Sequence, residues 1–515
     1  MLSNNRNGNN HLEEKLQRFL KSANLRVVDL FSGCGGLSLG FQRAGYKILG
    51  GVECDQKAAR THALNFFKGL SEEDLEIHAS PVDITDTSPE QFMIKVLHAE
   101  SPDNLLDIII GGPPCQAFAR IGRAKLRQVA EHSEAYLNDD RANLYLHFLK
   151  YVDFFRPLAV LIENVPDILN YGGKNVAEEI TSSLEDLGYS VRYTLLNAVN
   201  YGVPQFRLRF FLIAYLGGLN LSPEFPEPTH QTHIPTGYTW EKTVALKHLQ
   251  PNQKDFYNNQ IRYIQPPRVS DNLPEAVTAG QALADLPALT DHLKESKKHG
   301  ARKFDQQLSY RRGRPGIYAM MMRTWPGFEA SKGVVDHVIR FLPRDYEIFR
   351  QMKIDDQYPE AHIIAMKILE ARREEIEANT GLEIAENSPE YRALKKQFLP
   401  PYSVDKFPNK WWKINPDMPV RTLTAHIGKD TYTHIHYDSE QARVISVRDA
   451  ARLQSFPDGF VFAGAMNDAY RQIGNSVPPL MAFALAKKIL TQIQKIASQL
   501  PTEVLDRAEI NNAGQ

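Results

Sequence analysis

Cysteine, long apolar runs and an excess of charge of either sign are all scarce in this sequence of 515 residues. The three cysteines, Cys34, Cys54 and Cys115, are too few and too scattered for a disulfide framework or a zinc cluster. We therefore expect a reducing, cytoplasmic setting and no metal. The N-terminus has no apolar signal core, and no stretch of about 18 apolar residues occurs, which argues against an export signal and a membrane span.

The net charge of −1, from 60 basic and 61 acidic residues, does not by itself indicate a nucleic-acid partner. The distribution of charge is nevertheless uneven. The segment from Lys294 to Arg323 contains nine Lys and Arg residues and two acidic residues. The segment from Asp355 to Glu390 contains ten acidic residues and three basic ones. Either run is compatible with a solvated face, and the basic run is equally compatible with a phosphate-binding surface.

Short apolar runs alternate with longer amphipathic segments between about residues 25 and 220. The runs that read as buried strands are RVVDLF, YKILGGVE, LDIIIGG, LAVLIEN and RFFLIAY. This alternation predicts an α/β fold in which helices cover both faces of a mixed, mostly parallel sheet.

Changes in amino-acid composition and hydrophobic pattern along the chain predict its division into parts. We expect no regular structure in residues 1–10 and a short helix within 11–22. Many prolines follow residue 221, an acidic helical stretch spans 359–378, and a terminal helix begins at the Pro-Pro pair near 479. The predicted parts are an N-terminal extension (1–22), a catalytic and cofactor-binding domain (23–224), a second domain (225–415), a C-terminal return to the catalytic domain (416–498) and a loose tail (499–515).

A glycine-rich loop, SGCGG, follows the first predicted strand directly, where open parallel sheets bind ligands. Glu53 ends the second predicted strand, where its carboxylate can accept hydrogen bonds from ribose hydroxyls. Asp83 lies where we expect a third strand to end, suited to the amino group of an adenine. The loop lacks the Gly-Lys-Ser/Thr of triphosphate-binding loops, so a nicotinamide dinucleotide and S-adenosyl-L-methionine both remain candidates.

Cys115 follows a buried strand and the sequence Gly-Gly-Pro-Pro, which fixes the position of the thiol. A lone cysteine is usually a small buried hydrophobe, but this context favours a nucleophile that neighbouring cations such as Arg207 and Arg209 would activate. Glu163 ends another predicted strand and would face the same crevice. The alternative for Glu163 is a structural ion pair with arginine.

Six ordered strings, DLFSGCGG, GPPCQAF, ENV, QFRLR, RTLTA and QIGNSVPP, resemble the cytosine-5 DNA methyltransferases. The resemblance spans about residues 27–214 and 417–490. It implies a Rossmann-like sheet, a smaller target-recognition domain within 225–415, S-adenosyl-L-methionine as cofactor, and a flipped cytosine in double-stranded DNA as substrate. The chain departs from the commonest pattern in CQAFAR, where many members have serine after phenylalanine, and at Cys54, often a larger apolar residue.

The same resemblance implies roles for individual residues. Cys115 would add to carbon 6 of cytosine, Glu163 would hold ring nitrogen 3 and the exocyclic amine, and Arg209, supported by Arg207, would contact the carbonyl oxygen and phosphates. Phe31 would stack on the adenine. The full set of expected cofactor-binding residues is Phe31, Gly33, Gly35, Gly36, Leu37, Glu53, Cys54, Asp83, Ile84, Pro113, Leu144, Asn475 and Ser476.

DNA contacts are expected from two segments. Residues 116–143, with Gln116, Arg120 and Arg123, would form the loop that closes over DNA. In the second domain, Arg311, Arg312 and Arg314 would contact DNA together with the interleaved aromatic residues Tyr310, Tyr318 and Trp325. The acidic stretch would lie on the outer face, away from phosphate.

Other functions remain open from the sequence. A transfer RNA cytosine-5 methyltransferase would share the fold, although that branch has a short variable region, and a catalytically silent DNA-binding member would not need the intact Cys115, Glu163 and Arg209. A nicotinamide dehydrogenase fits the glycine loop alone. By analogy, the chain is expected to be a bacterial or phage restriction-modification enzyme that acts as a monomer on DNA beside a cognate restriction endonuclease.

Overall fold

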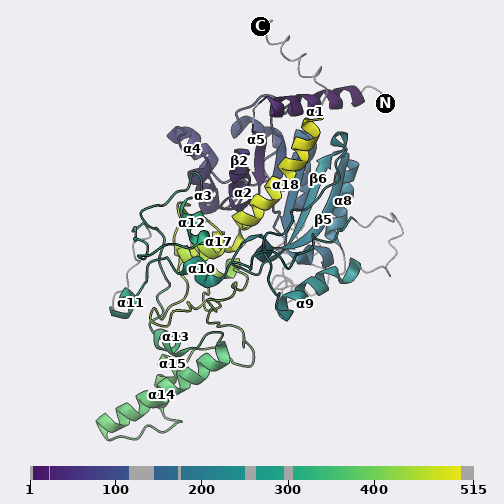
Figure 1. The fold of residues 1–515 in the computed structure, drawn as a ribbon. Helices are drawn as coiled ribbons and strands as arrows, with labels where there is room; N and C mark the ends of the chain where they lie inside the picture. Colours follow the sequence, from purple (N-terminus) through teal and green to yellow (C-terminus); the bar gives the residue numbers. More distant parts are fainter. Residues whose placement is uncertain are drawn as a thin grey trace. The chain divides into compact units, whose positions relative to one another are not determined.

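The structure is a computed structural model that describes residues 4–21, 24–114, 144–171, 175–249, 262–294 and 305–499 (Figure 1). By their internal contacts, the residues fall into two compact units. Unit 1 comprises Met1–Gly202, Phe206–Glu275 and Ser476–Gln515, and unit 2 comprises Val203–Gln205 and Ala276–Asn475. The functional boundaries predicted near 225 and 415 stay a prediction.

Unit 1 is built on a six-stranded sheet of order β2-β1-β3-β4-β6-β5. Strand β1 pairs in parallel with β2 and β3, β3 pairs in parallel with β4, and β6 runs antiparallel to both β4 and β5. The mixed, mostly parallel sheet is therefore confirmed. The strands are β1 (Arg26–Leu30), β2 (Lys47–Val52), β3 (Ile108–Gly111), β4 (Ala159–Asn164), β5 (Tyr189–Asn197) and β6 (Leu208–Leu216).

All five apolar runs read from the sequence are strands, but two strand expectations need correction. Strand β5 was not predicted, because Ser190 and Arg192 interrupt its apolar pattern near the edge of the sheet. The strand expected to end at Asp83 is wrong, since residues 81–83 have no strand structure. The Val82 amide nevertheless donates to the Glu53 carbonyl oxygen at 2.8 Å, which keeps this segment beside the end of β2.

The helices of unit 1 flank this sheet. Helix α1 (Asn4–Leu20) starts earlier than expected, so the prediction of no regular structure in residues 1–10 is wrong from Asn4 onward. The remaining helices are α2 (Gly36–Arg43), α3 (Gln56–Phe66), α4 (Glu72–Ala79), α5 (Pro89–Lys95), α7 (Leu144–Phe155), α8 (Val176–Asp186), α9 (Thr236–Ala245) and α18 (Pro479–Ala497), with short 3-10 turns η3 (Pro166–Asn170), η4 (Ala198–Tyr201), η5 (Gly217–Leu219) and η6 (Leu246–Leu249).

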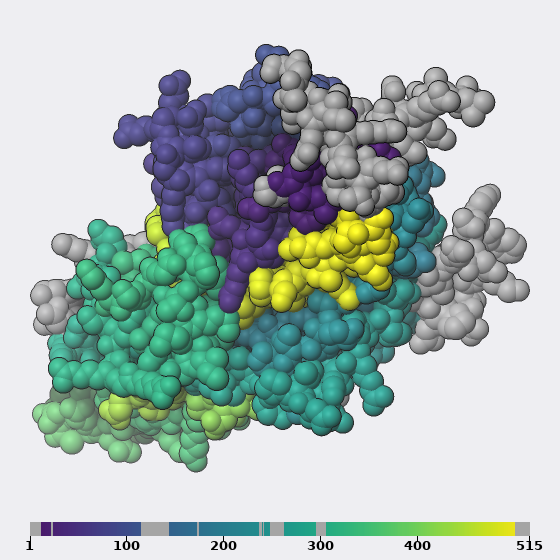
Figure 2. All heavy atoms as spheres, turned by 45° about the horizontal axis from the view of Figure 1, so that its top comes forward, coloured from purple at the N-terminus to yellow at the C-terminus, as the bar shows by residue number. Residues whose placement is uncertain are grey.

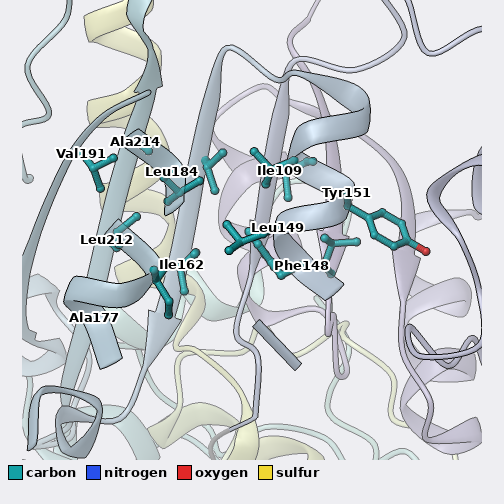
Figure 3. Packing of buried hydrophobic residues seen from close by; sticks show 14 of the residues in the cluster. Ile109, Phe148, Leu149, Tyr151, Ile162, Ala177, Leu184, Val191, Leu212 and Ala214 are labelled. Carbon is teal, nitrogen blue, oxygen red and sulfur yellow. The ribbon is translucent and has the colours of Figure 1, made fainter. Parts of the chain in front are cut away.

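One face of the sheet packs against α5, α7 and α8. Side chains from these helices, among them Phe92, Phe148 and Leu184, form one buried cluster with alternate strand residues such as Ile109 and Leu212 (Figure 3). Strand residues with the opposite parity point to the other face, because side chains alternate along a strand.

The other face packs against α18. The hydroxyl of Tyr215, which neighbours the cluster residue Ala214 on β6, donates to Gln492 of α18 at 2.8 Å. Helix α18 also packs on α2 so closely that a Cβ built on Gly40 would lie 2.4 Å from the Ala482 Cβ and 2.5 Å from the Phe483 nitrogen. In Figure 2 the yellow atoms of α18 lie against purple atoms of the N-terminal part of the chain. Helix α18 therefore packs against α2 and the sheet of unit 1, whereas the predicted bounds of the C-terminal return (416–498) stay a prediction.

Unit 2 contains short helices, long connections and one long helix. Helix α14 (Tyr358–Thr380) confirms the acidic helical stretch expected at 359–378. Buried aromatic residues form its main cluster, in which the rings of Trp411 and Tyr432 stack at 4.6 Å. The other helices are α10 (Ala279–Leu283), α11 (Asp291–Lys294), α12 (Ile317–Arg323), α13 (Tyr346–Gln351), α15 (Pro389–Phe398), α16 (Val447–Leu453), α17 (Met466–Asn475) and the 3-10 turn η7 (Ala425–Gly428).

Substituting Gly40 by alanine tests the close packing of α2 and α18. We expect Gly40→Ala to lower the free energy of unfolding by about 1–3 kcal/mol, because the new methyl group would overlap the backbone of α18. Chemical denaturation followed by intrinsic fluorescence measures the change. The control is Gln42→Ala at an exposed position of the same helix, where we expect a change within about 0.5 kcal/mol. Equal effects of the two substitutions would contradict the packing described.

Candidate functional site

The carboxyl ends of the parallel strands β1 to β4 meet at one edge of the sheet, and the predicted glycine loop lies there. Three residues of this loop, Phe31, Gly33 and Gly35, have positive φ values of 60°, 53° and 99°. For Phe31 this backbone is uncommon and strained, whereas glycine adopts it without a steric cost. The loop therefore turns sharply from β1 into α2.

Glu53 fixes the glycine loop to the end of β2. Its Oε2 accepts a hydrogen bond from the Gly33 amide at 2.9 Å, and its Oε1 accepts one from the Asp55 amide at 2.7 Å. Burial raises the pKa of Glu53, although these two amide donors oppose the rise. A Cβ built on Gly33 would meet nothing within 4 Å, so the loop borders open space beside this carboxylate.

The other expected cofactor residues of unit 1 lie around this edge in two groups. Leu37 and Ile84 are buried, and Phe31 and Leu144 are partly buried against the central cluster. Cys54 and Asp83 are exposed, and the Asp83 carboxylate accepts hydrogen bonds from the amide and hydroxyl of Thr85, at 2.9 and 2.8 Å.

Ser476 brings the C-terminal segment to the glycine loop. A Cβ built on Gly36 would lie 2.0 Å from the Ser476 Oγ, so only glycine fits at residue 36. Ser476 also interacts with the thiol of Cys34, whose pKa burial raises to about 12. Cys34 is therefore a protonated, structural thiol at neutral pH. Asn475 is the exposed last residue of α17 and belongs to unit 2.

Glu163 and Arg209 form an ion pair where the antiparallel strands β4 and β6 meet. The Arg209 Nε lies 3.2 Å from the Glu163 Oε1, and the two side chains are only 11% and 13% exposed. Burial raises the pKa of the Glu163 carboxyl, and the guanidinium groups of Arg209 and Arg207 oppose that rise. The pKa of this carboxyl therefore depends on the balance between its burial and its two arginine neighbours.

Two residues that the predicted site set omitted hold the chain between β3 and the predicted nucleophile. A Cβ on Gly112 would lie 2.9 Å from the Glu163 Oε2, and the buried Asn164 donates from Nδ2 to the Pro113 carbonyl oxygen at 3.1 Å. The Gly-Gly and Glu-Asn pairs in the motifs were the signal for these contacts. Cys115, Gln116, Arg120 and Arg123 lie outside the described residues.

Arg207 has a different partner from the one expected. Its side chain is buried, and its Nη2 donates to the Ser476 carbonyl oxygen at 3.0 Å, while its amide donates to the Asn197 Oδ1. In this arrangement Arg207 does not face solvent and links the strand of Arg209 to the segment beside the glycine loop. Its expected contact with phosphates is therefore not supported.

In unit 2, Arg311, Arg312 and Arg314 are exposed, as a role in DNA contact requires. Two of the aromatic residues expected to join them are instead core residues, since Tyr318 and Trp325 are only 4% and 1% exposed. The expectation that these two rings contact DNA is wrong, because a basic and aromatic pattern looks the same whether its rings point outward or inward.

The edge of unit 1 therefore combines a glycine loop that borders open space with a buried Glu163–Arg209 ion pair. Among the described residues, no group of three or more His, Cys, Asp or Glu side chains is arranged to hold a metal ion. No helix in the described ranges is long and apolar enough to cross a membrane.

Comparison with known proteins identifies relatives along nearly the whole chain. The family model described as C-5 cytosine-specific DNA methylase matches residues 25–491. A protein of Oceanobacillus iheyensis named as a type II methyltransferase is 39% identical over 468 residues, which cover 91% of this chain and 96% of that protein. The type II methyltransferase M.AgeI of Thalassovita gelatinovora is 28% identical over 91% of this chain and its own full length.

A solved structure supports the fold alone. It is described as a DNA modification methyltransferase encoded within a prophage of E. coli, and it matches with a TM-score of 0.57 and 22% identity. The match covers 92% of this chain and 100% of that chain.

Removing Arg209 tests the coupling of the buried ion pair. In Arg209→Ala we expect the pKa of Glu163 to rise further, because burial is then opposed less. The ionised carboxylate becomes costly in the folded state, so the destabilisation should be small near pH 5 and grow as the pH rises through the raised pKa. Thermal melting across this pH range measures it. The control is the Glu163→Gln background, in which Arg209→Ala should show no such pH dependence.

Proposed function

The chain belongs to the C-5 cytosine-specific DNA methylases and transfers a methyl group to carbon 5 of cytosine in DNA, and on this premise we propose the cofactor, the residues and the biological role. The observation that carries the assignment of residues is the buried Glu163–Arg209 pair beside the Gly112–Pro113 segment, which leads two residues later to Cys115.

The proposed cofactor is S-adenosyl-L-methionine, which supplies an electrophilic methyl group. The residues present fit it, because the glycine loop borders open space at Gly33 and presents the Glu53 carboxylate beside that space. Glu53 would hold the ribose hydroxyls, Phe31 would stack on the adenine, and Asp83 would accept from the adenine amine. Ser476, with Asn475, would close the site from the C-terminal segment.

The proposed chemistry on the cytosine overcomes the low nucleophilicity of carbon 5. The Cys115 thiolate adds to carbon 6, which turns the ring into an enamine whose carbon 5 can accept the methyl group. Glu163 holds a proton toward ring nitrogen 3 and so offsets the charge that develops when the thiolate adds. The buried position of Glu163 beside Arg209 supports this role. Arg209 orients Glu163 and contacts the carbonyl oxygen of the base.

After methyl transfer, a base removes the proton at carbon 5 and Cys115 leaves, which restores the aromatic ring. Reaching the target cytosine requires the enzyme to rotate it out of the duplex. Gln116, Arg120 and Arg123 would close over the DNA, and Arg311, Arg312 and Arg314 would contact it within the target-recognition domain. The enzyme is proposed to act as a monomer on its site.

The proposed biological role is protection of DNA in a type II restriction-modification system. The names of the relatives in Oceanobacillus iheyensis and Thalassovita gelatinovora support this role. A cognate restriction endonuclease that reads the same short sequence would be its functional partner.

Bisulfite sequencing of genomic DNA from a methylation-free host tests the function. Cells expressing the protein should carry methylcytosine at one recurrent short motif, and cells expressing Cys115→Ser should carry none, because serine is too weak a nucleophile to form the adduct. The purified variant should still bind duplex DNA. Methylation of transfer RNA in place of duplex DNA would contradict the proposed substrate, and unchanged methylation by Cys115→Ser would contradict the covalent mechanism.

Calorimetry tests the cofactor site. We expect Glu53→Gln to weaken the binding of S-adenosyl-L-methionine by about 10- to 100-fold, since a charged acceptor of hydrogen bonds becomes neutral. Glu73→Gln, at an exposed position of α4, is the matched control and should leave the affinity unchanged. Equal affinities of the Glu53→Gln variant and the unmodified protein would remove Glu53 from the site.

A further inference from the structure

Unit 2 presents one aliphatic side chain almost fully to solvent. Ile317, the first residue of α12, is 89% exposed, and Met320 on the same helix is 44% exposed. The opposite side of this short helix is buried through Tyr318 and Met322. Burying such a side chain against a partner is favourable, and what distinguishes Ile317 from other exposed hydrophobic residues is the charge beside it.

The chain just before Ile317 is strongly cationic. Arg311, Arg312 and Arg314 are exposed, and among the described residues neither Arg312 nor Arg314 has an ion-pair partner. Arg311 lies 3.7 Å from Asp438. The exposed isoleucine therefore stands beside two guanidinium groups that are available to an anionic partner.

Buried interactions hold both ends of this segment. The guanidinium of Arg323 lies 3.6 Å from the ring centre of Tyr310, so the two ends, thirteen positions apart, are stacked on each other. Arg323 also bonds Asp285 at 2.6 Å, and the amide of Arg311 donates to the Asp285 carbonyl oxygen at 3.0 Å. The segment from Tyr310 to Arg323 is thus closed into a loop, which we call the 310–323 loop.

A buried arginine, Arg452, holds the residues on which the 310–323 loop packs. Arg452, which is fully buried, bonds Asp285 at 2.9 Å and Asp458 at 2.5 Å. Asp458 accepts a further hydrogen bond from the Tyr310 hydroxyl at 2.5 Å, and the Tyr318 hydroxyl donates to the Arg452 carbonyl oxygen. Such fully paired groups fix the geometry of what they hold, so Ile317 is presented from a rigid base.

We propose that Ile317 is the apolar side chain that this enzyme sets against the bases of its DNA target, with Arg312 and Arg314 on the neighbouring phosphates; the proposal rests on the DNA methyltransferase function above. Aliphatic side chains contact thymine methyl groups or enter between base steps, and rotating a cytosine out of the duplex leaves a gap that such a side chain can occupy. Phosphate contacts carry no sequence information, whereas base contacts do.

Charge favours an anionic partner over a neutral one at the 310–323 loop, and the DNA methyltransferase function makes duplex DNA that partner. A second exposed isoleucine of unit 2, Ile363, is 55% exposed on α14, but that helix carries five glutamates against three cations. Both positions are exposed isoleucines near the surface of unit 2, and they differ in the charge around them. Ile363 is therefore a matched control for Ile317.

The test compares Ile317→Ala, Ile317→Leu and Ile363→Ala with the unmodified enzyme. Fluorescence anisotropy measures the affinity for an unmethylated duplex that contains the target motif and for a duplex of scrambled sequence. Single-turnover assays measure the rate of methyl transfer. We expect Ile317→Ala to lose about tenfold in the ratio of the two affinities, as for one base contact, and in the transfer rate on the motif. Ile317→Leu should recover most of both, and Ile363→Ala should change neither.

A second variant separates the arginines from the isoleucine. Arg312→Ala/Arg314→Ala should weaken binding to both duplexes alike and lower the slope of log affinity against log salt by about 2. Wild-type selectivity and rate in Ile317→Ala, with methylation of DNA intact, would overturn the proposal and leave the function standing. Loss of binding by these variants in a protein that does not methylate DNA would overturn the function and support the loop as a DNA contact.

Discussion

At Gly40 no side chain fits between α2 and α18, and the other contacts of the C-terminal segment with unit 1 depend on this close approach. The beginning of α18 holds Ser476 against Gly36 in the glycine loop, and the Ser476 carbonyl oxygen accepts from Arg207. Arg207 in turn precedes by two residues the Arg209 that pairs with Glu163. Because protein interiors are close-packed, a shift of α18 would displace both the glycine loop and the Glu163–Arg209 pair.

The sequence was most informative where one physical rule dominates. Buried strands such as β3 and β4 must be apolar on both faces, so their runs stand out. The edge strand β5 does not follow that rule, because Ser190 and Arg192 are only partly buried. Asp83 was assigned to a strand that does not exist, yet one backbone hydrogen bond from Val82 to the Glu53 carbonyl places it near the expected location.

The side chains were harder to predict than the strands. Arg207 and Arg209 have the same residue type and similar sequence context, but one is enclosed by the C-terminal segment and the other pairs with Glu163. Tertiary contacts with residues more than 200 positions away decide between these roles, and the local sequence pattern does not predict such contacts. The same limit explains why Tyr318 and Trp325 were taken for surface residues.

In unit 2, buried charged side chains orient their neighbours in a way that apolar side chains could not. Burial alone would raise the pKa of Asp458, but the Arg452 guanidinium outweighs it and holds that pKa below its ordinary value. Desolvating such groups offsets much of their attraction, so their net contribution to stability is small. These groups instead fix the orientation of the side chains around them. The carboxylates of Asp285 and Asp458 each accept hydrogen bonds from more than one donor, which holds those donors at fixed angles to each other.

The packing of α18 on α2 also sets the order in which the protein becomes functional on the ribosome. Tyr46, just after α2, and Ala486 of α18 are hydrogen-bonded although 440 residues separate them. At ordinary elongation rates of roughly 5–20 residues per second, the buried face of α2 waits on the order of 20–90 s for its partner. During that interval the nascent chain has its glycine loop but lacks Ser476, so an interrupted translation product carries Cys115, the proposed nucleophile, without the C-terminal contact to the glycine loop.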